Sequence, residues 1–343
     1  MSLKKMAFIA HWVENWNWLW WFGADITTAP RNSVFTAPLC SLASAAYLYG
    51  PKSFDLVDHF HYGKNIECRT ILLRNFAEHF HQPKNHARIR KNLLSAVVSA
   101  QEESDAIGLG ALTKAEWLTN GGEWIVRELG AQLKVPIVHG DTLTSAVVFQ
   151  QAVHLLERFG IGPVYITGGT SKIGRAVALS LARLEVPVRM YTQSQERYEH
   201  IQKEAKECGK YISHSRSLSD ARECTLWITG KAKPTGKEMI SASGNAPPVL
   251  NFSVPNPMRN VDFDEQQTLS VFEGGLLNYD PAHVNIRHTM RLPYGFAYSC
   301  HVGAIVHAYN GWKHHETGPV DVDSMSGVLH AAEEIGFSVP KFK

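Results

Sequence analysis

The sequence lacks the features that define several protein classes. Its five cysteines, at positions 40, 68, 208, 224 and 300, are odd in number, widely spaced and without a CxxC pair. A disulfide framework and a zinc ribbon are therefore not expected, and a reduced, cytoplasmic location is predicted. No apolar run reaches the ~18–20 residues of a membrane span. The N-terminal apolar stretch is also too short for a signal peptide.

Charge of one sign is also scarce. The 343 residues include 34 Lys and Arg against 32 Asp and Glu, so the net charge is only +2. This gives no electrostatic basis for binding nucleic acid. Apolar residues make up 44% of the chain, which is ordinary for a protein with a well-formed core.

Tryptophan, by contrast, is concentrated near the N-terminus. Residues 11–22, HWVENWNWLWWF, contain five, and the spacing of Trp12, Trp16 and Trp20 places them on one face of a helix. Such a segment either packs on the body of the fold or contacts a membrane surface, which would make the protein membrane-associated. Prolines in 24–52 indicate irregular structure. Residues 1–85 are thus predicted to be a mainly helical or irregular Trp/His-rich segment.

Two HxH pairs, in 58–61 and 79–81, resemble metal-binding motifs. The carboxylates near them are few: Asp55, Asp58, Glu67 and Glu78. We therefore predict no metal site.

From about residue 86 the pattern alternates between helix and strand. Residues 86–104 predict a helix, and 107–112, 124–129 and 135–140 predict short strands. Asp141 or Thr142 is a suitable N-cap for a helix over 142–158, which we expect to connect two domains. The predicted first domain, residues 86–160, would bind the substrate.

A dinucleotide-binding turn follows. Residues 163–183, PVYITGGTSKIGRAVALSLAR, read as strand, glycine-rich turn and helix, with a second strand at 186–192. Gly168 and Gly174 occupy the first and third glycine positions of the motif, and Ser171 the middle one. The helix N-terminus would face the pyrophosphate. Residues 161–290 are predicted to form a Rossmann-type, doubly wound parallel sheet, and 291–343 C-terminal helices that return to the α/β substrate domain.

The end of the second strand bears on the choice of cofactor. NAD-binding folds usually carry Asp or Glu there, whereas residues 191–195 contain neither. Ser194 and Arg197, with Lys172, are suited to a 2′-phosphate and favour NADPH, unless Arg197 is simply a solvated helix residue. The predicted cofactor-binding residues are Gly168, Gly169, Thr170, Ser171, Lys172, Ile173, Gly174, Ser194, Arg197, Gly230 and Gly274, and Ser253 is also expected to line the cleft.

One cysteine lies in a histidine-rich stretch, residues 298–315, YSCHVGAIVHAYNGWKHH. If this is a helix, Cys300 and His307 are about 10.5 Å apart along its axis, too far to share one metal ion. The thiol is better suited to nucleophilic attack on a thioester. His301 or His307 would assist the sulfur, and the small Gly303 and Ala304 would leave room for an acyl chain. The alternative is a buried structural cysteine.

The same stretch contains a YxxxK pattern, Tyr309 and Lys313, similar to the acid/base pair of short-chain dehydrogenases. Phe296, however, stands where that family has its catalytic serine. A short-chain-dehydrogenase-like oxidoreductase therefore stays open as an alternative.

Three blocks together resemble a known family: TGGTSKIGRAVALSLAR, VPIVHGDTLTSAVV and SCHVGAIVHAYNGWKHHETGPVDVD. They look like the C-terminal domain of plant eceriferum-type wax-biosynthesis proteins and, more distantly, cyanobacterial long-chain acyl-[acyl-carrier-protein] reductases. The resemblance covers residues 105–343. It departs at Ser171, where the reductases have glycine, and at Asn310, where they have an acidic residue.

The resemblance implies an NADPH-dependent enzyme that reduces a long-chain acyl thioester, on acyl carrier protein or CoA, to a fatty aldehyde. It places the acylated cysteine at Cys300, and puts Thr142 and Thr144 at a helix start facing the substrate. A partner enzyme that processes the aldehyde is expected. The other reading is a non-catalytic nucleotide-binding partner subunit in wax or hydrocarbon synthesis.

Overall fold

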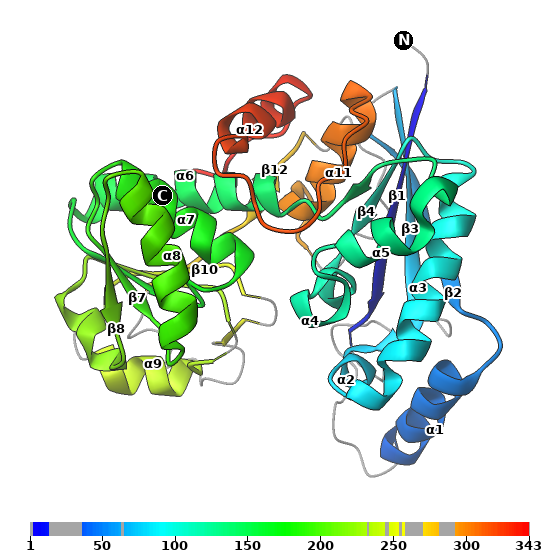
Figure 1. Ribbon diagram of the computed structural model, residues 1–343, viewed down its shortest axis with the longest axis horizontal. Coiled ribbons are helices and arrows are strands. Elements are labelled where there is room, and N and C mark those ends of the chain that lie inside the picture. Colours follow the sequence, from blue (N-terminus) through cyan, green and yellow to red (C-terminus); the bar gives the residue numbers. More distant parts are fainter. Residues whose placement is uncertain are drawn as a thin grey trace. The chain divides into compact units, whose positions relative to one another are not determined.

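The computed structural model describes residues 3–13, 36–62, 65–231, 233–243, 247–253, 256–257, 270–280 and 292–342 (Figure 1). The chain forms two compact units. The first comprises Met1–Gly140 with Tyr279–Gly318, and the second Asp141–Asn278 with Pro319–Lys343. Among the described residues, no helix combines the length and apolar composition needed to cross a bilayer.

The first unit is built on a mixed sheet. Its described strands have the order β2-β3-β1-β4-β5, in which β1 runs parallel to β3 and β4, and β2 is antiparallel to β3. The elements are β1 (Lys4–Trp12), α1 (Thr36–Tyr49), β2 (Phe54–Tyr62), β3 (Ile66–Phe76), α2 (Ala77–Phe80), a 3₁₀ turn (Pro83–Asn85), α3 (His86–Gln101), β4 (Ala106–Leu109), a 3₁₀ turn (Ala111–Lys114), α4 (Glu116–Thr119), α5 (Glu123–Leu129), a 3₁₀ turn (Gly130–Gln132), β5 (Ile137–Val138), β13 (Phe296–Tyr298) and α11 (Ser299–Asn310).

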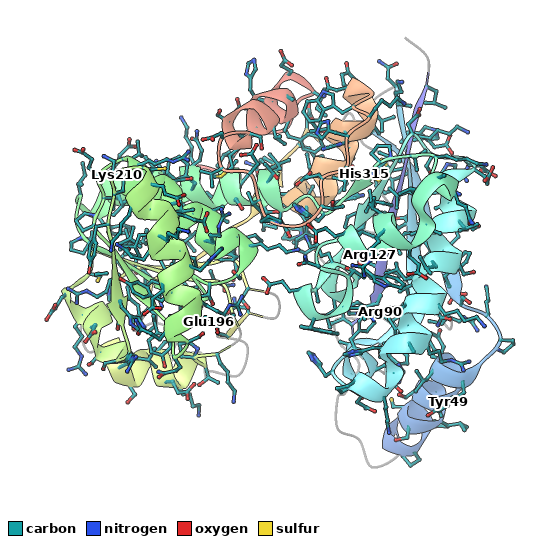
Figure 2. All side chains as sticks on the ribbon, viewed as in Figure 1. Tyr49, Arg90, Arg127, Glu196, Lys210 and His315 are labelled. Carbon is teal, nitrogen blue, oxygen red and sulfur yellow. The ribbon has the colours of Figure 1, made fainter. Side chains whose placement is uncertain are left out.

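Helices cover both faces of this sheet. Ala7 and Ile9 of β1 pack in a core cluster with Leu93 and Val97 of α3. Phe8 points the other way, where its ring meets His301 of α11 at 4.6 Å between centroids. On the α3 side, Arg90 ties the helices together, since its Nε donates to the Leu118 carbonyl at 2.9 Å (Figure 2).

The structure differs from the predicted division of the chain, because residues 1–85 supply three of the strands of the described sheet. A strand buried on both faces is continuously apolar and shows no alternation by which to recognise it. Trp12 ends β1 and packs edge-on against Tyr47, whereas Trp16, Trp18, Trp20 and Trp21 lie outside the described residues.

Two local predictions were also wrong. The stretch 24–52, expected to be irregular, contains α1, whose first turn holds Pro38. Proline is tolerated there because the first N–H groups of a helix have no partner within it. Residues 124–129, expected to be a strand, lie in α5. This helix begins after Gly122, whose backbone has the left-handed conformation.

The second unit confirms the predicted Rossmann-type, doubly wound fold. Its described parallel strands have the order β8-β7-β6-β9-β10-β11, which in chain order reads 3-2-1-4-5-6. The elements are α6 (Asp141–Phe159), β6 (Val164–Thr167), α7 (Lys172–Arg183), β7 (Val188–Tyr191), α8 (Gln195–Glu207), β8 (Ile212–Ser215), a 3₁₀ helix (Leu218–Glu223), β9 (Leu226–Thr229), α9 (Gly236–Ser243), β10 (Val249–Asn251), β11 (Val271–Glu273), β12 (Leu276–Asn278) and α12 (Met325–Glu334).

Two core clusters lie on opposite faces of this sheet. One includes Val164 and Ile166 with α6, α7 and α8, and the other includes Tyr165 and Trp227 with Met239 of α9. The helix predicted at 142–158 is present as α6. The predicted C-terminal helices are divided, because α11 belongs to the first unit and α12 packs on α6 in the second.

Burial of Trp12 predicts a stability effect that a surface anchor would not have. Trp12 is 4% exposed and Trp117 is 46% exposed. We expect Trp12→Ala to lower the free energy of unfolding by about 3–5 kcal/mol. The control Trp117→Ala should lower it by about 1 kcal/mol or less. Urea unfolding of both variants measures the difference, and equally small losses would contradict the packing of Trp12.

Candidate functional site

The glycine turn after β6 depends on close backbone contact. Gly168 has φ +77°, a conformation that favours glycine. A Cβ on Gly174 would lie 2.3 Å from the Gly168 carbonyl oxygen. Only glycine therefore lets the first turn of α7 close on the end of β6, which brings the helix N–H groups to the strand end where a pyrophosphate binds.

Ser171 explains the departure from the glycine motif. Its Oγ accepts a hydrogen bond from the Gly174 N–H at 3.2 Å and donates to the Gly168 carbonyl at 2.8 Å. Ser171 is thus the N-cap of α7 and fixes the turn itself. Ser171 was interpreted only as a member of the glycine motif, so this role was missed. A serine directly before a helix is nevertheless typical of an N-cap.

Of the glycines expected around the cofactor, Gly230 lies beside this turn. It follows β9, the neighbour of β6, and its N–H donates to the Thr167 carbonyl at 3.0 Å. In the order 3-2-1-4-5-6 the gap between β6 and β9 is the point at which ligands bind. Gly274 instead follows β11, three strands from β6, so the structure does not bring it to the turn.

Ser194 and Arg197 lie after β7, the second strand, where NADP-binding and NAD-binding folds differ. Ser194 is the N-cap of α8 and accepts a hydrogen bond from the Arg197 N–H at 3.3 Å. The Arg197 guanidinium donates to the Thr170 carbonyl at 2.7 Å. Arg197 is exposed, but this bond directs its guanidinium at the glycine turn, and Lys172 opens α7. Residues 168–174, 194 and 197 thus meet around the turn that would hold a nucleotide cofactor, and a preference for NADPH stays a prediction.

Cys300 is held by a second glycine contact, in the first unit. It is the second residue of α11 and is half-buried. Gly140 has φ +67°, and a Cβ there would lie 2.2 Å from the Cys300 carbonyl oxygen. The positive end of the α11 dipole favours negative charge at this position. Cys300 as a reacting thiol stays a prediction.

The small residues after Cys300 fill space rather than leave it. A Cβ on Gly303 would lie 2.9 Å from the Gly140 Cα. Ala304 is fully buried, and a Cβ on Gly108 would lie 2.6 Å from its methyl group. The structure thus gives Gly303 and Ala304 a packing role, because they let α11 approach β4. Thr142 and Thr144 lie in the first turn of α6, in the second unit, and the Thr144 methyl packs near Gly275.

Neither predicted histidine is suited to favour the thiolate form of Cys300. His301 is buried against Phe8 and Phe60, and this burial lowers its pKa to about 4, so it is neutral at pH 7. His307 follows Cys300 by seven residues, about 10.5 Å along the helix. Its Nε2 lies 3.4 Å from Glu316 Oε2.

A buried His–Glu–His cluster was missed. Glu316 lies between His139, at 3.0 Å from Nδ1 to Oε1, and His307. Burial would raise the pKa of Glu316, but the two histidines outweigh it and hold that pKa well below its usual value. The backbone of Glu316 also bonds to Ile137 and His139 beside β5. Because His139 precedes Gly140, the cluster fixes the turn that touches Cys300. The only sequence signal was a glutamate after paired histidines.

The YxxxK pattern does not form one helical face. Tyr309 is in α11, but Gly311, with φ +64°, ends the helix before Lys313. A pair four residues apart faces one way only on a continuous helix. This geometry does not support the short-chain dehydrogenase alternative.

Comparison with known proteins identifies the family. The model of the family described as CER1-like, C-terminal domain, matches residues 164–339. The chain belongs to this family. Rice (Oryza sativa subsp. indica) very-long-chain aldehyde decarbonylase GL1-2 is 32% identical over 242 residues, covering 68% of this CER1-like chain and 35% of that protein. GL1-1, from the same subspecies, is 31% identical over 266 residues, covering 74% and 39%.

The CER1-like chain therefore spans little more than a third of these relatives. Among solved structures, quinate dehydrogenase from Corynebacterium glutamicum in complex with NAD aligns with a TM-score of 0.43 and 11% identity, over 96% of this chain and 100% of that one. The relatives also correct the predicted enzyme class. They are named aldehyde decarbonylases, so the assignment of the CER1-like chain as an acyl-thioester reductase was wrong.

The cluster around Glu316 predicts a pH-dependent contribution to the stability of the CER1-like chain. Because its pKa is lower in the folded than in the unfolded chain, this contribution is fully present above the ordinary pKa of 4.5 and is lost as the pH falls through the folded pKa. We expect Glu316→Gln to lower the free energy of unfolding at pH 7 by about 1–3 kcal/mol.

Urea unfolding between pH 7 and pH 3 provides the measurement. The difference between Glu316→Gln and wild type should narrow below pH 4.5. Glu334→Gln, which removes an exposed partner of His330, is the control and should have little effect at any pH. A difference that stays constant over this pH range would contradict the ionised cluster.

Proposed function

We propose that this chain is an NADPH-dependent oxidoreductase that reduces long-chain aldehydes at the carbonyl carbon. The observation that carries the proposal is the glycine turn at the point where the strand order of a 3-2-1-4-5-6 sheet reverses. The substrate class is taken from relatives named very-long-chain aldehyde decarbonylases.

Different residues of the second unit would bind different parts of NADPH. The first turn of α7 would take the pyrophosphate on its N–H groups, with Ser171 holding the turn in shape. Arg197 would pair with the 2′-phosphate, because a guanidinium is suited to bidentate bonds with phosphate oxygens. Its bond to the Thr170 carbonyl supports this role by aiming the side chain at the turn.

In the first unit, the N–H groups at the start of α11 are of the kind that suits a carbonyl oxygen. Bound NADPH supplies hydride for the carbonyl carbon. The helix N-terminus would stabilise negative charge on the carbonyl oxygen, and a proton from water would complete the alcohol. Cys300, half-buried at this end, would contact the carbonyl group. The rigid Gly140 contact supports the proposal because it fixes the sulfur's helix in place.

A second candidate is that this region binds the nucleotide but does not catalyse the reaction alone. The part of GL1-2 that it matches is 35% of that protein. The two candidates differ in whether the chain alone oxidises NADPH when aldehyde is added.

Cofactor choice can be tested at Arg197. We expect Arg197→Ala to weaken NADPH binding about 10- to 100-fold, as the loss of a charged hydrogen bond implies, and to change NADH binding little. Lys203→Ala, an exposed cation on the same helix, is the control and should bind both as wild type does. Fluorescence titration gives the dissociation constants. Equal weakening of NADH would contradict recognition of the 2′-phosphate.

The reaction can be tested with purified chain, NADPH and a long-chain aldehyde. We expect NADPH oxidation with an equal yield of alcohol, and at least a tenfold lower kcat in Cys300→Ala with NADPH affinity unchanged. Cys208→Ala alters an exposed thiol and should retain wild-type activity. NADPH binding without oxidation by wild type would favour the second candidate, and full activity in Cys300→Ala would exclude a role for the thiol.

A further inference from the structure

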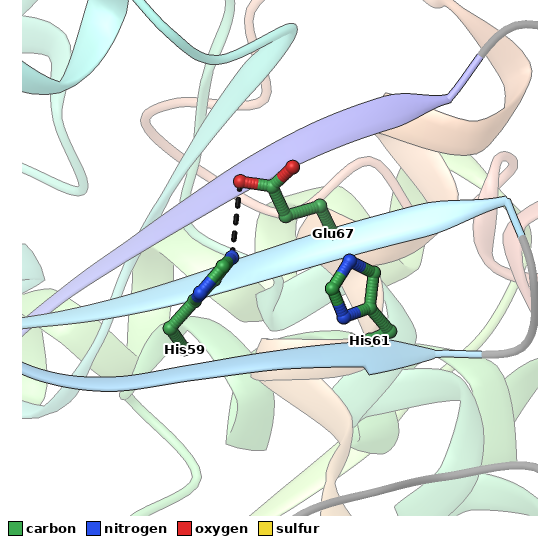
Figure 3. A group of neighbouring side chains, drawn as sticks. All are labelled: His59, His61 and Glu67. Atoms are coloured by element: carbon green, nitrogen blue, oxygen red, sulfur yellow. Dashed lines mark ion pairs between the residues drawn. The ribbon is translucent and has the colours of Figure 1, made fainter.

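Two neighbouring strands of the first unit bring two imidazoles and a carboxylate together. His59 and His61 are two residues apart on β2, so their side chains lie on one face of the strand. In the antiparallel register His61 stands opposite Glu67 of β3, and His59 opposite Arg69. Figure 3 shows the rings of both histidines and the Glu67 carboxylate converging on the same side of the two strands.

The three side chains are spaced almost as metal ligands. One ligand atom from each lies within 4.8 Å of the other two. His59 Nε2 is already 3.1 Å from Glu67 Oε1. Tetrahedral Zn²⁺ with bonds of about 2.0–2.2 Å needs ligand atoms about 3.4 Å apart. Both imidazoles are exposed, His59 to 50%, so side-chain rotation can close the remaining distance without moving the sheet.

Nearby cations compete for the carboxylate without excluding a metal. Arg69 donates to Glu67 Oε1 from Nε at 3.2 Å and from Nη2 at 3.1 Å, and Lys5 Nζ lies 3.6 Å from Oε2. Arg69 also pairs with Glu103, so two positive and two negative groups meet here and their formal charges cancel. An ionised carboxylate has about four lone-pair sites, which leaves capacity for a metal beside these bonds.

We propose that His59, His61 and Glu67 form a binding site for a divalent transition-metal ion, with Zn²⁺ as the ion tested. Two imidazole nitrogens and one carboxylate oxygen suit Zn²⁺, whereas Mg²⁺ and Ca²⁺ prefer oxygen ligands alone. Water would complete the coordination. The ion would join β2, the antiparallel edge strand, to β3. This proposal departs from the prediction that the histidine pairs bind no metal, and it is independent of the proposed function.

Isothermal titration of the chelator-treated full chain with Zn²⁺ tests the site, and the visible spectrum of bound Co²⁺ reports imidazole ligation. We expect one Zn²⁺ equivalent to be bound by wild type. His59→Ala, His61→Ala and Glu67→Gln should each weaken this binding at least tenfold. His330→Ala removes an exposed histidine 3.5 Å from Glu334, a matched pair on α12, and should bind as wild type does.

Circular dichroism of each variant separates loss of ligand from loss of fold. Both histidines are exposed, so His59→Ala and His61→Ala should keep the wild-type spectrum even if Glu67→Gln does not. Wild-type affinity in the His59→Ala and His61→Ala variants would overturn the proposal. It would also be overturned by equal weakening in His330→Ala, because the bound metal would then be spread over surface histidines.

Discussion

At both candidate sites, a helix begins directly against the end of a strand or turn because glycine lets two backbones touch. Gly174 closes on Gly168 in the second unit, and Gly140 closes on Cys300 in the first. A single Cβ at either position would fall well inside the contact distance of real atoms. Each contact fixes a helix N-terminus, and with it a group of N–H donors and a positive dipole end. The positions of Arg197 and Cys300 depend on that constraint.

The second unit could be predicted from sequence because its signals are local. A short apolar strand, a glycine turn and a helix lie within about twenty residues of sequence, and a βα turn of this kind has few alternative structures. Ser194 and Arg197 lie at the next strand end, so their approach to the turn follows from the parallel order. The first unit offered no such signal. β1 is apolar on both faces, and its neighbours in the sheet are β3 and β4, far along the chain.

The site around Cys300 shows where sequence reasoning ends. Small residues such as Gly303 and Ala304 are equally consistent with room for a ligand and with close packing, and only the positions of Gly140 and Gly108 decide between them. A histidine next to a cysteine can likewise either assist the thiol or be a buried, neutral core residue. His301 turns out to be neutral because it is buried between phenylalanine rings. The cluster joins His139 to His307 and Glu316, which lie far along the chain from it, and no spacing rule relates them.

The same reasoning explains why thiol chemistry could not identify the substrate. A cysteine at a helix N-terminus is suited to any electrophilic carbonyl carbon, whether in a thioester or in an aldehyde, because both develop negative charge on oxygen. The distinction lies in the leaving group, which a thioester has and an aldehyde lacks. Reduction of an aldehyde therefore requires a hydride and stabilisation of charge on the carbonyl oxygen. It does not require an acid that protonates a departing thiolate. The neutral His301 and the distant His307 are poor acids for a departing sulfur, which supports an aldehyde rather than a thioester as the substrate that we propose.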